Sequence, residues 1–227
     1  GIPAEPLFRS QLIPEVTKYT SKPTALFSNT QIENPNLMLE GMPNYRSGVD
    51  GLRVSNSTKG GITFAASTTQ NGIHMITVVL GVESVDGDPY ARFVATSSLM
   101  NYVVRTFVSS IVVKEGDPYG KSKATIMDGK SETVLAVAKK DFYIVEKQGS
   151  QAEPKIQFKS DQESFRAPVK SGTNLGKLHY TDPDKIGRGY LEDQEPTVDM
   201  VAGRTIEKSF FLKVWWNEFV RYVNEKL

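Results

Sequence analysis

The sequence predicts an α+β protein in three parts: antiparallel strands with helices over residues 1–113, a small all-β domain over 114–205, and an amphipathic helix over 206–227. Three observations lead to this division. An Asn-Gly dipeptide joins two alternating runs, short apolar runs separated by turn residues follow, and the last stretch contains neither glycine nor proline. With 227 residues, the chain can bury a substantial core.

The first part contains three predicted strands, Asp50–Ser55, Ile62–Thr69 and Ile73–Gly81. The last two alternate between apolar and other side chains, which is typical of strands with one buried face. Asn71-Gly72 stands between them, and a type I′ turn needs a positive φ at both of its central residues. The two strands should therefore form a hairpin.

Around this hairpin the pattern is weaker. Glu5–Tyr19 fits a short amphipathic helix broken near Pro14, and Ser21–Tyr45 reads as turns with one short strand. Asp88 and Pro89 are expected to be the N-cap and the first residue of a second helix. Its apolar side recurs at helical spacing, at Phe93, Met100, Val103 and Phe107.

The middle part reads as all-β, with Glu115–Pro118 as its linker to the first part. Gly, Pro, Asp and Ser separate its apolar runs. The runs are Val134–Ala138, Phe142–Val145, Ile156–Phe158, Leu175–Tyr180 and Val198–Val201.

The tail, Ile206–Leu227, is predicted to be one helix whose apolar residues fill about half of its circumference at 100° per residue. We interpret this side either as docked on the rest of the protein or as lying in a membrane interface, where Trp and Phe are favoured. Its charged face forbids spanning. The candidate membrane-contact residues are Phe211, Leu212, Trp215, Trp216, Phe219, Val220 and Val223.

The amino-acid composition excludes some classes of function. With 27 basic and 26 acidic residues, the formal charge is +1, which argues against a nucleic-acid binder held by a strong basic field. The absence of cysteine excludes a Cys nucleophile and a Cys-based metal site, and it fits either a reducing cytosol or an exported protein. No signal peptide is visible at the start of the sequence, so a mature or a cytosolic form is expected. No cofactor is expected.

Val49-Asp50-Gly51-Leu52, approached through Asn36–Gly41 and Gly48, resembles the active-site strand of the penicillin-binding D-alanyl-D-alanine carboxypeptidases. In that family, Val-Asp-Gly-Leu runs directly into Lys-Thr-Gly. The tail Ile206–Trp216 resembles the streptococcal-type members in particular. The resemblance covers nearly the whole chain and implies a truncated penicillin-binding or β-lactamase-like domain, then a small all-β domain, then an amphipathic helix on the outer face of the cytoplasmic membrane.

The sequence departs from the family where the family's chemistry resides. Arg53, Val54 and Ser55 stand at the three positions of Lys-Thr-Gly. Arg53 replaces a compact ammonium with a planar guanidinium, and Val54 replaces a hydroxyl with a methyl group. Ser55 adds a side chain where the family has glycine. The 227 residues also contain no Ser-x-x-Lys nucleophile motif and no Ser-x-Asn motif. The expectation is a catalytically inactive relative, with no catalytic residue of its own.

The resemblance implies a secreted, membrane-associated protein of the bacterial envelope that acts as a scaffold or regulator in peptidoglycan metabolism. The alternative is one fragment of an active carboxypeptidase whose Ser-x-x-Lys part comes from another chain. Expected partners are the membrane surface, peptidoglycan or a cell-wall protein, and a second copy of the chain if the sheet remnant exposes apolar surface. A gene product with no selected role is a third possibility.

Other candidate sites are weak. His74 and His179 lie in predicted strands, where a structural role is more common than a catalytic base or a zinc ligand. An acidic loop reads as a solvated face rather than a calcium site. It contains Asp182, Asp184, Glu192, Asp193 and Glu195. Lys59-Gly60-Gly61 lacks the spacing of a phosphate loop.

Overall fold

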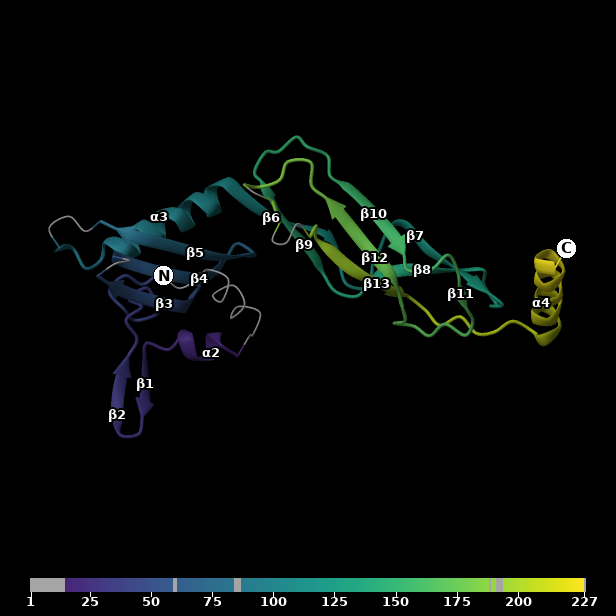
Figure 1. The fold of residues 1–227 in the computed structure, drawn as a ribbon, viewed down its shortest axis with the longest axis horizontal. Coiled ribbons are helices and arrows are strands. Elements are labelled where there is room, and N and C mark those ends of the chain that lie inside the picture. Colours follow the sequence, from purple (N-terminus) through teal and green to yellow (C-terminus); the bar gives the residue numbers. More distant parts are fainter. Residues whose placement is uncertain (1–14, 59–60, 84–86, 188, 191–193, 227) are drawn as a thin grey trace. The chain divides into compact units, whose positions relative to one another are not determined.

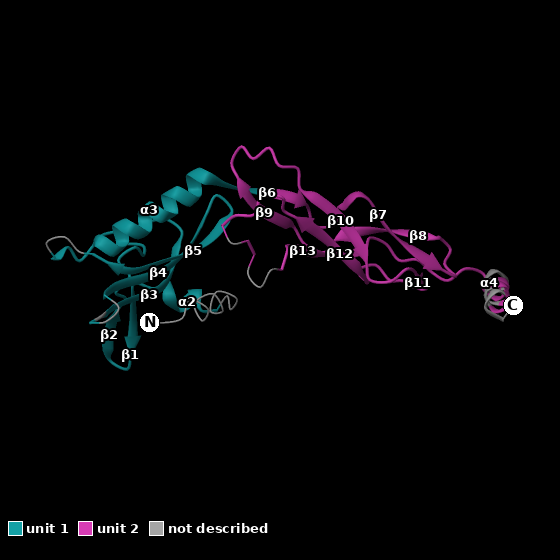
Figure 2. Ribbon diagram, turned by 45° about the horizontal axis from the view of Figure 1, so that its top comes forward, with its two compact units in different colours: residues 1–109 teal, residues 110–227 magenta. Residues whose placement is uncertain are grey.

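The structure is a computed structural model that describes residues 15–58, 61–83, 87–187, 189–190 and 194–226. Two compact units divide the chain, Gly1–Ser109 and Ser110–Leu227 (Figure 2). The helix predicted over Glu5–Tyr19 lies largely outside the described residues, and the part that is described contains helix α2, Thr17–Thr20.

The first unit is built on a three-stranded antiparallel sheet, β3 (Val49–Ser57), β4 (Gly61–Gln70) and β5 (Ile73–Val82) (Figure 1). Asn71 and Gly72 join β4 to β5 with φ values of 51° and 74°, which confirms the predicted hairpin turn. Helix α3, Ala91–Thr106, packs on one face of this sheet. The rings of Phe64 and Phe93 meet edge to face there, with centroids 5.2 Å apart.

Two expectations for this unit need correction. Ser21–Tyr45 forms a two-stranded hairpin, β1 (Thr24–Phe27) and β2 (Thr30–Glu33), rather than turns with one strand. The α3 helix begins at Ala91 with Tyr90 as N-cap, so the predicted cap at Asp88 and Pro89 is wrong by two residues. The Asp88 carboxylate instead accepts a hydrogen bond from the Tyr90 amide at 2.8 Å in the preceding turn.

The second unit contains a six-stranded sheet in the order β10-β12-β13-β8-β7-β11 and a separate pair, β6 with β9. The two sheets share one apolar core, because Val113 of β6 and Phe142 of β9 cluster with Leu178 and Met200 of the larger sheet. The strands are β6 (Phe107–Val113), β7 (Pro118–Met127), β8 (Thr133–Ala138), β9 (Phe142–Lys147), β10 (Lys155–Ser160), β11 (Phe165–Arg166), β12 (Asn174–Thr181) and β13 (Thr197–Ala202).

The segment predicted as a linker, Glu115–Pro118, is a tight turn inside this second unit. The Gly116 amide donates to the Ala138 carbonyl at 2.8 Å, and the Ala138 amide donates to the Asp117 carbonyl at 2.9 Å. The chain passes from one unit to the other at about Ser109, within β6.

The last helix, α4, spans Phe211–Lys226 and is shorter than the predicted Ile206–Leu227. Ile206 belongs to the β-structure instead. Its side chain is buried in the core of the second unit, and its amide and carbonyl bond to Val169 at 2.7 and 2.9 Å. Strands dominate the described chain, which is therefore β-rich with few helices, a narrower description than the expected α+β class.

Candidate functional site

Strand β3 carries Arg53, Val54 and Ser55 in the middle of the sheet's register. They pair with Ala65, Phe64 and Thr63 of β4, respectively. Side chains alternate between the faces of a strand, so Val54 points to the opposite face from Arg53 and Ser55. The structure therefore separates the three residues onto two faces.

Val54 faces the apolar core. It is partly buried and packs against the cluster that contains Phe64 and Phe93 beneath α3. Arg53 is exposed on the other face, and Ser55 is half-buried. Val54 contributes a packing contact and Arg53 contributes a cation. The middle position therefore lacks the hydroxyl that the threonine of Lys-Thr-Gly would offer.

Arg92 of α3 holds the far end of β3. Its side chain is buried, and Nη1 donates to the carbonyls of Ser55 and Thr63, each at 3.1 Å. Nη2 donates to Oδ1 of Asn56. Burial lowers the pKa of Arg92, but an arginine keeps its proton in proteins, so the group remains a cation. One side chain thus binds two strands and the helix together.

The near end of β3 is held by polar groups from the preceding segment. The Thr20 hydroxyl donates to the Asp50 carbonyl at 2.7 Å, and the Asn36 amide donates to the Gly51 carbonyl at 3.1 Å. Ser67 of β4 donates to the Asp50 carboxylate. Asn36 is fully buried, and its own oxygen accepts from the Met38 amide at 3.0 Å. The strand is therefore fixed at both ends.

Gly48, just before β3, gives the first testable prediction. Its φ is +83°, and a Cβ there would lie 2.5 Å from the Thr69 carbonyl oxygen. Gly48→Ala should therefore lower the free energy of unfolding by about 3 kcal/mol, as measured by urea denaturation. Gly41→Ala is the matched control, with a φ of +80° but no atom within 4 Å of the added carbon. It should cost only about 1 kcal/mol. Equal losses would contradict the close approach of the two backbones.

The two histidines lie in different units. His74 is exposed on β5. His179, on β12, is half-buried, and its pKa is lowered first by burial and then by Lys159 and Lys177, while Glu195 acts in the opposite direction. Among the described residues, no three potential metal ligands gather at one point.

His179 gives a prediction on pH. Its folded pKa lies below the ordinary 6.5, so below pH 6.5 the unfolded chain takes up a proton that the folded chain excludes. The contribution of His179 to stability is complete above pH 6.5 and is lost as the pH falls toward its folded pKa. His179→Gln should therefore make the free energy of unfolding fall less between pH 8 and pH 5. If urea titrations gave the variant the same pH dependence of the unfolding free energy as the natural chain, the prediction would be wrong.

The acidic loop is tied by its own contacts. Asp182 accepts a hydrogen bond from the Tyr190 hydroxyl at 3.1 Å, and Lys185 pairs with Glu195 at 3.9 Å. Asp184 lies 3.9 Å from Lys147. Glu192 and Asp193, like Lys59 and Gly60, lie outside the described residues. The described carboxylates of this loop are thus engaged with protein groups.

Helix α4 presents large aromatic side chains to solvent. Trp215 and Trp216 are each 59% exposed. The Trp215 ring stacks on Phe219 with centroids 5.9 Å apart, and Trp216 lies 6.0 Å from the same ring. Of the other candidate contact residues, Phe211 and Val220 are exposed and Val223 is half-buried, while the side chain of Leu212 lies outside the described set. Within the described part of the chain, no helix is long and apolar enough to cross a membrane.

The sequence did not single out Arg92 or Asn36, although both position β3. Arg92 lies in the first turn of α3 among apolar residues, which is an unusual place for a charge and was a usable signal. Asn36 bonds to a carbonyl 15 residues further along the chain, and local pattern carries no information on such a contact.

Part of the chain matches a known protein family. Residues 107–208 match the family described as penicillin-binding protein 5, C-terminal domain. A D-alanyl-D-alanine carboxypeptidase, DacA of Haemophilus influenzae, is 25% identical over 169 residues, which are 74% of this chain and 41% of that protein.

Solved structures agree. The crystal structure of a peptidoglycan synthesis regulatory factor, PBP3 of Streptococcus pneumoniae, has 43% identity and a TM-score of 0.82, covering 87% of this chain and 53% of that one. Penicillin-binding protein 5 of Haemophilus influenzae shares the fold, with 21% identity and a TM-score of 0.56, covering 88% of this chain and 53% of that one. The chain spans about half the length, or less, of these relatives.

The fold and these matches support a C-terminal part of a penicillin-binding D-alanyl-D-alanine carboxypeptidase. The streptococcal protein is a close structural relative. Members of this family are penicillin-binding proteins of the cell envelope.

Proposed function

We propose that this chain is a non-catalytic member of its family that acts at the outer face of the bacterial cytoplasmic membrane, as a scaffold or regulator of peptidoglycan metabolism. Strand β3 is the observation that carries the proposal. Arg53, Val54 and Ser55 occupy the Lys-Thr-Gly positions, and Val54 packs into the core beneath α3. A catalytic triplet of this kind needs polar groups directed at a substrate carboxylate, and a valine has none.

The chemistry of the family explains why this strand matters. A serine attacks the D-Ala-D-Ala peptide, and an oxyanion hole stabilises the charge that develops on the carbonyl oxygen. Arg53 keeps a positive charge, but its planar guanidinium does not replace a compact ammonium in either geometry or hydration. Ser55 adds a side chain where the family's glycine allows close backbone approach. The altered triplet therefore disfavours substrate binding wherever the serine lies in the complete protein.

Helix α4 supports the membrane part of the proposal. A helix docked on its own protein would bury its aromatic side chains, whereas Trp215, Trp216 and Phe219 remain exposed as one aromatic cluster. Sixteen residues give a helix about 24 Å long, suited to lie in the interface plane. At 100° per residue, the sequence positions of Lys213 and Arg221 fall opposite the apolar side of the helix. The relative from Streptococcus pneumoniae is described as a regulatory factor of peptidoglycan synthesis, and we extend that role to this chain.

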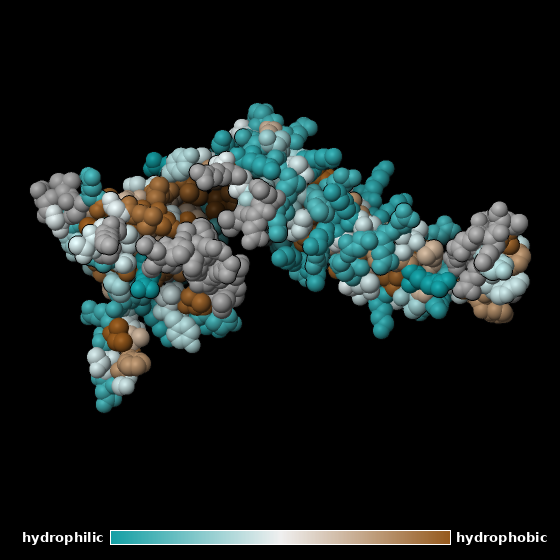
Figure 3. All heavy atoms as spheres, viewed as in Figure 1, coloured by the Kyte–Doolittle hydropathy of each residue, from teal (hydrophilic) through white to brown (hydrophobic). Residues whose placement is uncertain are grey.

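The competing function is a fragment of an active carboxypeptidase, with the serine supplied by another part or another chain. The surface of the first unit favours this alternative. Large apolar side chains remain exposed on β5 and α3, at Leu80, Val94, Leu99 and Tyr102. Figure 3 shows hydrophobic residues gathered on the near face of this unit. Either the rest of a penicillin-binding domain or a second copy of the chain would cover them.

Release of D-alanine from a peptide ending in D-Ala-D-Ala separates the two functions. The complete natural protein should release none. A second arm carries Arg53→Lys, Val54→Thr and Ser55→Gly together. Turnover by the natural protein would refute the non-catalytic role. Turnover by the triple variant alone would support the altered strand as the cause of the natural protein's inactivity.

The membrane part is tested by removing α4. The truncated chain should end at Ser209, because Ile206 is buried in the second unit and the Ser209 amide donates to the Asp128 carbonyl at 2.8 Å. We expect the full chain to sediment with anionic liposomes and the truncated chain to stay in the supernatant. Equal sedimentation would refute membrane docking through α4.

A further inference from the structure

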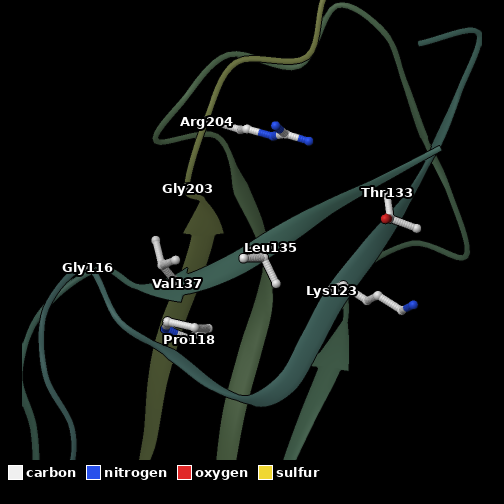
Figure 4. A pocket seen from close by; sticks show the side chains of 8 residues that line it. All are labelled: Gly116, Pro118, Lys123, Thr133, Leu135, Val137, Gly203 and Arg204. Atoms are coloured by element: carbon white, nitrogen blue, oxygen red, sulfur yellow. The ribbon is translucent and has the colours of Figure 1, made fainter. Parts of the chain in front are cut away.

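A hollow on the second unit is lined by no residue of β3 or α4. It opens on the outer surface of β7, β8 and the segment after β13, and its volume is about 470 Å³ (Figure 4). Cavities of this size accommodate small ligands or a few residues of a peptide. Its lining includes Pro118, Lys123, Thr133, Leu135, Val137 and Arg204.

An irregularity of β7 shapes this hollow. Strand β7 advances from Pro118 to Lys123 while its partner β8 advances only from Val137 to Leu135. Gly120, with a φ of +55°, lies within this excursion. The buried Ser122 hydroxyl fixes it, donating to the Ala136 carbonyl at 2.9 Å and accepting from the Tyr119 amide at 3.2 Å. The excursion is therefore a built part of the strand, as bulges in folded sheets are.

The chemistry of the lining is apolar at the centre and cationic at the sides. Leu135 is 54% exposed, and Val137 beside it is half-buried. Lys123 and Arg204 are exposed and lie on different sides of Leu135 (Figure 4). The residues that line the hollow include no Asp or Glu.

Several cations elsewhere on this unit pair with carboxylates. Lys130 pairs with Glu207, and Lys139 lies 3.6 Å from Asp199. Across the described chain, the structure records no such pairing for Lys123 or Arg204. The lining of the hollow therefore carries two cations and no carboxylate, and electrostatic complementarity favours an anionic ligand.

We propose that this hollow binds an acidic peptide segment. In an extended peptide, alternate side chains point to the same face about 7 Å apart. An apolar side chain can therefore lie over Leu135 and Val137 while carboxylates on either side of it meet Lys123 and Arg204. A lipid headgroup would use the two cations but would leave the apolar floor without a partner. The site does not depend on the chemistry of β3 or on membrane docking by α4.

Fluorescence anisotropy tests the site on the full chain. The probe is a labelled, acetylated peptide with a central leucine and a glutamate two residues away on either side, and its glutamine counterpart is the neutral control. Lys123→Gln with Arg204→Gln should weaken binding of the acidic peptide about tenfold, as the loss of two exposed ion pairs would. The neutral peptide should bind no better to the natural chain than to this variant.

The matched control is Lys159→Gln with Lys177→Gln, two exposed cations paired across β10 and β12 away from the hollow. It should change the affinity by less than about twofold. Leu135→Ser should also weaken binding while thermal unfolding stays unchanged, since Leu135 is largely exposed. Equal affinity of the natural chain and the Lys123 and Arg204 variant would overturn the proposal. A second result would also overturn it. If the Lys123 and Arg204 variant lost binding to phosphatidylglycerol vesicles but bound the peptide as the natural chain does, the hollow would be a lipid headgroup site.

Discussion

Replacing Trp215 and Trp216 together with alanine should weaken binding to anionic liposomes at least about a hundredfold. Each indole that leaves water for the interface buries on the order of 100 Å² of apolar surface, and burial stabilises by about 25 cal/mol per Å². The two rings share their contacts with Phe219, so their removal takes apart one aromatic cluster. Sedimentation with vesicles over a range of lipid concentrations measures the change.

Tyr143→Ala is the control for this prediction, because Tyr143 is an exposed aromatic residue on β9, outside α4. It should leave liposome binding unchanged. Circular dichroism should show that the double tryptophan variant keeps its secondary structure, since alanine favours a helix. Undiminished binding by that variant would contradict the assignment of the aromatic face of α4 to the membrane.

Gly176→Ala should be the most destabilising single-methyl substitution among those considered, lowering the free energy of unfolding by at least about 3 kcal/mol. Gly176 pairs with Ser160 of β10 on one side and Met200 of β13 on the other, at an irregularity of β12. A Cβ at this position would lie 2.1 Å from the Lys159 carbonyl oxygen and 2.8 Å from the Ser160 Cα. Both are backbone atoms, so relief requires the strands to separate.

Gly172→Ala separates this steric effect from backbone strain. Gly172 has a φ of +83°, but no atom lies within 4 Å of an added carbon. Its substitution should cost only about 1 kcal/mol. Urea denaturation, followed by intrinsic fluorescence and circular dichroism, measures both variants. A Gly176→Ala chain as stable as the Gly172→Ala chain would show that β10 and β12 do not approach as closely as the structure has them.

Local pattern predicted the fold where side chains alternate or turn residues are specific. The β4–β5 hairpin is one such case, because Asn71 and Gly72 both adopt the positive φ that the turn requires. Strand β7 is the opposite case. Its buried positions are Ser122, Ala124 and Ile126, and only the last is a large apolar residue, so the segment gave no strand signal.

The ends of the helices were less predictable than their existence. Asp88 and Pro89 have the composition of a helix start, but the Asp88 carboxylate accepts from Tyr90 in a turn, and α3 begins afterwards. At the other end of the chain, Ile206 continues the apolar pattern of α4 yet pairs with Val169 in the second unit. Competition between a local helical pattern and a distant strand pairing decides such boundaries, and the sequence alone does not reveal it.

The candidate site was predictable in position but not in its supports. The Val-Asp-Gly-Leu frame located β3 and the altered triplet, which the structure places on two faces of that strand. The contacts of Arg92, Thr20 and Asn36 with β3 join residues far apart in the sequence. The hollow on the second unit was also beyond prediction, because it depends on the irregular step of β7 against β8.

Covalent labelling by a fluorescent penicillin tests the central claim most directly, since an active member of the family acylates its serine with this compound. The complete natural protein should be incubated with the label, alone and in envelope fractions, beside an active D-alanyl-D-alanine carboxypeptidase. A chain whose strand β3 carries Arg53, Val54 and Ser55 should remain unlabelled while the active enzyme is labelled. Covalent labelling at a comparable rate would contradict the non-catalytic role.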